Sequence, residues 1–314
     1  MAQPANTFST YGQVGIREDL SDMIWDISPT EVPFSTMCGK NKATATLHEW
    51  QTDELAAAAA DNAMIEGDDS VTDAAVPTVR RNNQTQILVK VPRVTETSQA
   101  VNTAGRSNEM AYQIGKRTKE LKRDLESSLL DNQAKVVGSD TVARRMAGVP
   151  AWIATNTSAG LTGADPVGDG SNARTDGTQR AFTEALMTDV LQQCYQSGGD
   201  PETLMVGPVN KQRASGFSGN VQRREDAGDK RLTAAIDVYV SDFGVLKIVP
   251  NRFQRERDGL VLQKDMWKVS QLRGLANTEL AKTGSSVRRK LEMEVTLEAC
   301  NEAASGIIAD LTTA

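Results

Sequence analysis

Apolar residues recur every three or four positions in three stretches of the chain, and this spacing predicts amphipathic helices. The first stretch, residues 17–28, ends before Pro29. The second covers about 105–134, contains no proline, and would form a rod of about 40 Å if all of it is helical. The third begins after Thr183, a residue type that can cap a helix, and ends at 198–199 with two glycines. The stripe of the longest helix consists of Met110, Ile114, Leu121, Leu125 and Leu129.

Alternation of apolar and polar residues predicts extended strands elsewhere. The pattern holds at 43–50 and at 84–94, and it is clearest at 288–299. The apolar face of this last strand consists of Leu291, Met293, Val295 and Leu297. Residues 31–34 should also be extended, because the residue before Pro33 avoids the helical region. Shorter apolar runs predict strands at 204–206, 236–241, 244–250 and 259–263, with a short helix at 209–217.

The segment between the first two strands, residues 51–83, contains an alanine run and several acids but little that could form a core. A loop of about thirty residues is uncommon inside a compact domain, and such loops are usually functional, disordered or docked on a partner. A glycine- and asparagine-rich connection at 155–177 separates the first part of the chain from an α/β unit. Residues 218–231 are polar and read as an exposed loop.

Composition restricts the classes of protein that fit. The chain has 314 residues, enough for one large or two medium domains, and a net charge of −6, so it lacks the basic character of most nucleic-acid-binding proteins. Cys38, Cys194 and Cys300 lie far apart without C-x-x-C spacing, so we expect reduced thiols packed as small hydrophobic residues and a chain made in a cytoplasm. We expect neither a signal peptide nor a membrane span.

Candidate chemistry is sparse. The one histidine, His48, could be a general base beside Glu49 or Asp53, or a strand histidine at an interface or surface. Its mid-strand position favours the second interpretation. The acidic pairs at 68–69 and 225–226 lie in polar loops without a calcium-loop framework. No phosphate-binding glycine loop, zinc motif or nucleophile elbow is present in the sequence. We therefore predict no catalytic, cofactor-binding or metal-binding residues, and no enzyme.

Short basic clusters, at 80–81, 144–145, 223–224 and 288–290, are interleaved with acids. Each could touch a nucleic-acid backbone, but this pattern is more typical of solvated faces or of ion pairs across a subunit boundary.

The order of elements is distinctive: an N-terminal arm, two strands around a long loop, a spine helix, an α/β unit and a terminal strand. This organisation resembles the major capsid proteins of tailed double-stranded DNA bacteriophages. The sequence is similar to one family of these head proteins at 17–55, at 198–212 (GGDPETLMVGPVNKQ), at 245–253 (VLKIVPNRF) and at 296–311.

The resemblance implies an α+β fold with the parts named in that family. These are an N-arm at 1–42, an E-loop (a β-hairpin) at 43–95, a P-domain at 96–179 with the spine helix, an A-domain at 180–265, and a return to the P-domain sheet at 266–314. It also implies self-assembly into pentamers and hexamers of an icosahedral virion head around double-stranded DNA, after synthesis in the host bacterial cytoplasm.

Partners and contacts follow from the same resemblance. We expect a separate scaffolding protein, because the chain lacks a long charged helical N-terminal extension. A decoration protein, a portal and weak non-specific contact with packaged DNA are further expected partners; no cofactor or membrane is expected. Position alone suggests the intersubunit contact candidates: His48, Trp50, Arg80 and Arg81 against a neighbour's spine, and Trp25 in the arm beneath an adjacent subunit.

Three alternatives remain open at this point. The first is the shell of an encapsulin-type cellular nanocompartment with the same fold, which would enclose an enzyme instead of a genome. The second is a metal-dependent hydrolase that uses acidic loop residues. The third is a monomeric binding module.

Overall fold

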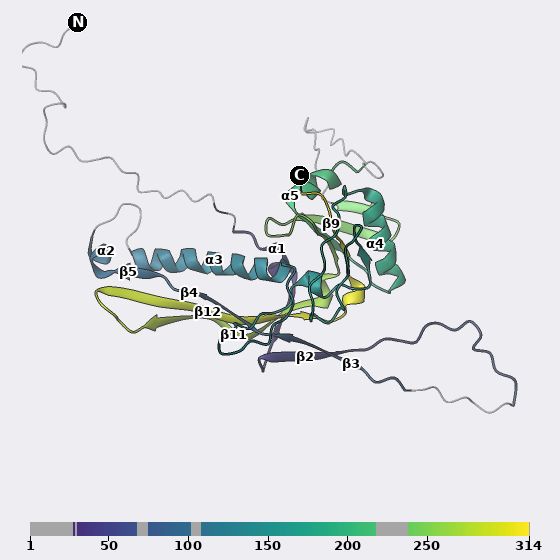
Figure 1. The fold of residues 1–314 in the computed structure, drawn as a ribbon, viewed down its shortest axis with the longest axis horizontal. Coiled ribbons are helices and arrows are strands. Elements are labelled where there is room, and N and C mark those ends of the chain that lie inside the picture. The colour runs from purple at the N-terminus through teal and green to yellow at the C-terminus, as the bar shows by residue number, and fades with distance from the viewer. Residues whose placement is uncertain (1–27, 29, 68–74, 102–107, 218–237, 314) are drawn as a thin grey trace, which may run out of the picture.

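A long helix lying along a long sheet forms the larger of two units, and an α/β unit adjoins one end of it (Figure 1). The computed structural model describes residues 28, 30–67, 75–101, 108–217 and 238–313. The predicted helix at 17–28, with Trp25, therefore lies outside the described residues, as do the loop at 218–231 and both acidic pairs.

The sheet of the larger unit has five strands in the order β1-β11-β12-β4, and β5 also pairs with β12. Its two longest strands, β11 (Trp267–Leu280) and β12 (Ser286–Ala299), are antiparallel. The remaining strands are β1 (Gly39–Lys42), β4 (Gln86–Lys90) and β5 (Arg93–Thr95). The predicted terminal strand is confirmed. Strands β1 and β11 were not predicted.

Side-chain alternation on β12 explains how the sheet and helix pack. Leu291, Met293, Val295 and Leu297 are buried, as expected for one face of the strand. The last three of them share a core with Leu121, Leu125 and Leu129 of helix α3, Glu109–Leu130. Glu292, Glu294 and Glu298 occupy the opposite face of β12. The sheet therefore has a helix side and an opposite side, and each side presents different chemistry.

Helix α3 is shorter than predicted at its C-terminal end. It begins after Asn108, whose side chain accepts a hydrogen bond from the Ala111 amide at 3.0 Å, and it has 22 residues. The prediction extended the helix to 134, but Asp131 is extended and Gln133 instead donates from its side chain to the Ser128 carbonyl. The stripe that predicted the helix is confirmed, with Ile114 only partly buried.

A two-stranded hairpin lies on the side of the sheet opposite α3. Its strands are β2 (Leu47–Thr52) and β3 (Val79–Gln84), paired in register from Leu47–Gln84 to Thr52–Val79. Two strands around a long loop are thus confirmed, but the second predicted strand, 84–94, is wrong in detail. The partner of β2 starts earlier, and residues 86–95 form β4 and β5, which pair with β12 and are interrupted at Pro92.

Residues 31–34 are not all extended, contrary to the prediction. Pro33 starts the short helix α1, Pro33–Met37, and Val32 before it is not helical. Proline suits the first position of a helix, where the missing N–H has no partner to lose. The rule for the preceding residue therefore holds, but it does not extend to Pro33 itself.

The α/β unit contains a sheet of six strands in the order β6-β13-β10-β7-β9-β8. Helix α4 (Glu184–Gln196) buries Met187, Val190, Leu191 and Cys194 against it. This helix and strands β7 to β10 confirm the predicted elements, although the Thr183 side chain makes no capping hydrogen bond. The strands are β6 (Thr157–Ser158), β7 (Thr203–Val206), β8 (Val238–Ser241), β9 (Gly244–Pro250), β10 (Gly259–Leu262) and β13 (Gly306–Ile308).

The remaining helices are short: α2 (Glu96–Ala100), α5 (Pro208–Ala214) and three 3-10 turns at Val149–Ala151, Lys264–Met266 and Glu302–Ala304. Among the described residues, no helix is long and apolar enough to cross a bilayer. Cys38 and Cys194 are buried and free, as predicted, while Cys300 is half-buried.

The loop between β9 and β10 holds a buried carboxylate. Asp258 is 1% exposed, and its Oδ2 accepts a hydrogen bond from Arg255 at 2.9 Å. Its Oδ1 has no partner among the described residues. Burial raises the pKa of Asp258 to about 6, although the charges of Arg255 and Arg174 pull it down. The unpartnered oxygen is consistent with burial as the stronger effect.

This carboxylate should make stability depend on pH. Because the pKa of Asp258 is higher in the folded chain than its ordinary value of 3.8, the folded state binds the proton more readily. The free energy of unfolding should therefore gain a contribution as pH falls from 7.5 to 4.5. In Asp258→Asn that gain, roughly 2 kcal/mol, should be missing. Urea unfolding at both pH values measures it, with the exposed Asp265→Asn as control. Equal pH dependence in Asp258→Asn and the native chain would contradict it.

Candidate functional site

The segment that joins β2 to β3, residues 53–78, is the most exposed part of the described chain. Every described residue in it is exposed, including the apolar Leu55 at 99%, Ile65 at 78% and Val76 at 79%. The sequence of this loop contains acids and no lysine or arginine. Apolar side chains that remain in water indicate a segment whose stable environment lies outside its own subunit. We call this segment the 53–78 loop.

The base of the hairpin, in contrast, is held firmly to the body. The Trp50 indole N–H donates to the Ala299 carbonyl at 2.7 Å, and its ring lies 5.3 Å from that of Trp152. On the paired strand, Asn83 is fully buried and donates to the Leu297 carbonyl at 2.8 Å. We call His48, Trp50 and Asn83 the hairpin root. Because these contacts hold the root in place, they fix the direction in which the 53–78 loop leaves the body.

His48 completes this root through a contact with a carboxylate. Its Nε2 lies 3.1 Å from Oε2 of Glu298, a carboxylate that also accepts hydrogen bonds from Asn41 and Ser270 at 2.9 Å each. Burial alone would raise the pKa of Glu298, but these hydrogen bonds outweigh it and hold the pKa below its ordinary value. The arrangement ties β2 to β1, β11 and β12 at one carboxylate.

The general-base interpretation of His48 beside Glu49 or Asp53 is therefore wrong. Neighbouring residues of a strand point to opposite faces. Glu49 accordingly faces away and accepts from Arg80 at 2.5 Å. The imidazole is engaged with Glu298 as a structural contact, as expected for a strand histidine.

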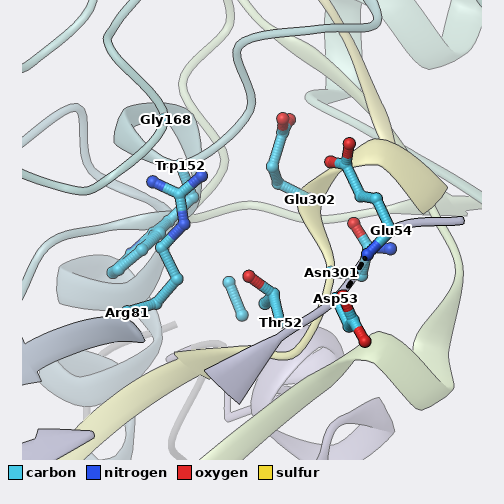
Figure 2. Close-up of a pocket in the computed structure, with 9 residues that line it drawn as sticks. Thr52, Asp53, Glu54, Arg81, Trp152, Gly168, Asn301 and Glu302 are labelled. Atoms are coloured by element: carbon cyan, nitrogen blue, oxygen red, sulfur yellow. Dashed lines mark hydrogen bonds between the residues drawn. The ribbon is translucent and has the colours of Figure 1, made fainter. Parts of the chain in front are cut away.

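A small hollow lies beside the root. Figure 2 shows Arg81 and Trp152 on one side of it and the carboxylates of Glu302, Glu54 and Asp53 on the other. Within the described residues, the Arg81 guanidinium forms no hydrogen bond or ion pair. Glu302 is engaged, because its carboxylate accepts from the Ala154 and Thr155 amides. The lining of the hollow thus combines one guanidinium with three carboxylates, which makes it a polar surface.

The described part of the chain contains no group of three or more histidine, cysteine or acidic side chains placed to hold a metal ion. Of the five contact candidates, the structure brings His48, Trp50, Arg80 and Arg81 together on one hairpin, while Trp25 lies outside the described residues. His48 and Trp50 contact their own subunit, and Arg80 pairs with Glu49. Arg81 forms no ion pair among the described residues, although its charge acts on Asp169.

Sequence reasoning missed Asn83 as a member of the root, and it missed the root's partners Glu298 and the Ala299 carbonyl. Nothing local could identify them, because the contacts join positions about 250 residues apart in sequence.

Comparison with known proteins gives a consistent result. The model of the family described as SU10 major capsid protein matches residues 3–312. The curated major capsid protein of Escherichia phage Phieco32 is 32% identical over 346 residues, covering 98% of this chain and 97% of that protein.

Solved structures support the same fold at low sequence identity. The capsid of a native GTA particle is similar with a TM-score of 0.67 and 9% identity, covering 98% of this chain and 100% of that one. The holo-SrpI encapsulin complex of Synechococcus elongatus PCC 7942 is similar with a TM-score of 0.56 and 12% identity, covering 96% and 95%.

Proposed function

Because the chain belongs to the SU10 major capsid protein family and is a structural shell protein of a phage, we propose that it assembles as pentamers and hexamers of an icosahedral head. The 53–78 loop and the N-terminal arm would join neighbouring copies. The head would enclose double-stranded DNA. The family is structural, which agrees with the absence of catalytic motifs from the sequence.

The observation that carries the intersubunit role is the combination of a rigid root and an unsupported loop. Trp50 and His48 hold the root by contacts within the subunit, whereas Leu55 and Ile65 of the loop remain in water. A loop that merely linked two strands would be short, because β2 and β3 pair as far as Thr52–Val79. The long acidic extension therefore supports docking on another copy.

The side from which the loop departs indicates where it docks. The root contacts Glu298, on the side of the sheet opposite α3. Rotational symmetry in a closed shell turns the same side of every copy outward. We therefore propose that the loop lies on the neighbour's sheet, on the side opposite α3. This placement differs from the contact with the neighbour's spine helix that was expected from the sequence.

An apolar strip on that side supports this placement. Ile87 and Val89 of β4 pair with Glu294 and Glu292 and so point away from α3, whereas Leu88 between them is buried with the α3 core. Together with Val91, just after the strand, they are 40–46% exposed. We propose that the apolar residues of the loop cover this strip. We propose that Arg81, whose guanidinium forms no hydrogen bond or ion pair with the described residues, meets a carboxylate of another copy.

Purified protein tests the proposal by negative-stain electron microscopy and light scattering over a concentration series. Closed shells, or rings of five and six subunits, are expected, either alone or with the products of neighbouring genes. Strictly monomeric protein under both conditions would overturn the proposal.

We also propose a separate scaffolding protein, a portal, a decoration protein and weak non-specific contact with packaged DNA as partners, and synthesis in the host cytoplasm. The purified chain closing shells of correct size on its own would argue against the scaffolding protein.

The likeness to an encapsulin makes a nanocompartment shell the second candidate. The family match and the phage relative favour the phage head. Analysis of the contents of particles purified from the native source decides between them, because a phage head contains double-stranded DNA whereas a nanocompartment contains a protein cargo.

A further inference from the structure

One buried carboxylate connects three parts of the molecule. Glu126 on α3 is fully buried, and both of its oxygens are used. Oε1 accepts from the Phe34 amide and from the Asn251 side chain, each at 2.7 Å. Oε2 accepts from the Ser35 amide at 2.8 Å. Its donors thus come from α1, where the N-terminal arm meets the body, and from the α/β unit.

The contact with α1 replaces a missing helix cap. The first amides of a helix have no partner within the helix, and a side chain just before it usually accepts from them. Val32 occupies that position in α1 and provides no such acceptor. Glu126 instead accepts from the amides of the second and third residues of α1, so the start of this helix is held by α3.

Two further interactions support the contact of Glu126 with the α/β unit. Asn251, immediately after β9, is 1% exposed, and its Oδ1 accepts from the Phe253 amide at 2.9 Å. Arg123, one turn before Glu126 on α3, lies over the Phe253 ring at 5.5 Å. Helix α3 therefore contacts the segment after β9 through two side chains, Glu126 at Asn251 and Arg123 at Phe253.

Glu126 forms no ion pair with any described residue, so its carboxylate is stabilised by the three N–H donors. Burial and the negative charge of the nearby Glu126 both raise the pKa of the Cys38 thiol. A buried carboxylate without a cation is costly to maintain. Its presence here therefore suggests a role that an apolar residue or an amide could not fulfil.

We propose that Glu126 is a positioning residue, the joint that fixes the direction of the N-terminal arm relative to α3 and the α/β unit, and that assembly of correct shells requires both of its oxygens. The assembly part of this inference rests on the proposed function. Because residues 30–32 of the arm lead directly into α1, a change in the attachment of α1 changes the direction of this described part of the arm.

Glutamine provides a sharp test, because it has nearly the same shape as glutamate. In Glu126→Gln the amide NH₂ would replace either Oε1, which faces the Phe34 amide and the Asn251 side chain, or Oε2, which faces the Ser35 amide. At least one backbone N–H therefore loses its acceptor. Whichever of the Phe34 and Ser35 amides faces the NH₂ should exchange hydrogen at least about tenfold faster. Exchange at Leu121 and Leu125 should be unchanged. Asp124→Asn is the matched control, because it removes a half-exposed carboxylate of the same helix that pairs with Lys90.

The full chain is used, first unassembled for hydrogen exchange and then under assembly conditions for electron microscopy. Glu126→Gln should give open or irregular particles, and Asp124→Asn normal shells. Native-like exchange at residues 34–35 in Glu126→Gln would contradict the proposal that Glu126 positions α1. Uniformly faster exchange over α3 and β12 would contradict it as well, because it would indicate general destabilisation. Native-like shells would overturn the role of Glu126 in assembly. Failure of the native chain to form shells would instead count against the proposed function, and the exchange result would still stand.

If Glu126→Gln does not fold, Asn251→Ala provides a second test, because it removes one donor and leaves α1 capped. Exchange of the Phe253 amide should accelerate about tenfold while residues 34–35 stay protected. No change at Phe253 would overturn the link to the α/β unit.

Discussion

Replacing residues 53–78 with Asn-Gly should give a chain that folds normally and no longer closes shells. Thr52 and Val79 form the last pair of the hairpin, so a two-residue turn can connect them directly. The described residues of the loop are exposed, and shortening a loop lowers its closure entropy cost. The free energy of unfolding should therefore not fall, and it should rise by up to about 2 kcal/mol. Assembly should fail because every copy loses the contact that its loop makes with the next, and the contact of the arm alone would remain.

Urea unfolding checks the first part of this expectation, and light scattering with electron microscopy checks the second. A full-length control separates the loop's length from its apolar contacts: Leu55→Ser, Ile65→Ser and Val76→Ser together should weaken assembly and leave the loop in place. Shells of native size and yield from the shortened chain would show that the loop does not join subunits.

The apolar strip at the proposed docking site was not identifiable in advance. Ile87, Val89 and Leu88 read as one continuous apolar run in the sequence, and only pairing with β12 shows which of them face α3. An edge strand with apolar residues on both faces leaves the buried face ambiguous until its partners are known.

The parts of the fold that the sequence predicted are those with one buried face. Helix α3 and strand β12 each carry a single apolar stripe, and both were identified. Strand β11 was missed because its second half, after Leu272, is largely exposed on both faces, so its residues show no alternation. Strand β3 was counted as loop for the same reason, since Val79-Arg80-Arg81 is exposed or only partly buried.

The candidate site was predicted only in outline. The hairpin and its contact candidates were identified from position and resemblance, whereas the partners that hold the root lie at the other end of the chain. Glu126 gave no signal at all. It stands in a row of charged residues with Arg123 and Asp124, a composition typical of a solvated helix face, and only the tertiary structure places it in the core.

The hairpin root should account for about 2–3 kcal/mol of local stability, and Trp50→Ala should remove it. This change deletes the ring that packs on Trp152 and leaves the Ala299 carbonyl without its indole donor. Trp50→Phe keeps an aromatic ring and loses only the hydrogen bond, so its cost should be about 1 kcal/mol. Hydrogen exchange of β2 and β3 measures the difference, with β12 as the internal reference.

Assembly of the same two variants tests whether the hairpin root directs the 53–78 loop toward the neighbouring subunit. If the root fixes the direction of the 53–78 loop, the yield of closed shells should follow its stability, from the native chain through Trp50→Phe to Trp50→Ala. The chain without the loop should give the lowest yield. Trp50→Ala retains every residue of the loop, so a defect in assembly must come from its orientation. Native shell yield from Trp50→Ala, despite faster exchange in β2 and β3, would show that the neighbouring subunit sets the loop's direction on docking, and that the root only stabilises the isolated chain.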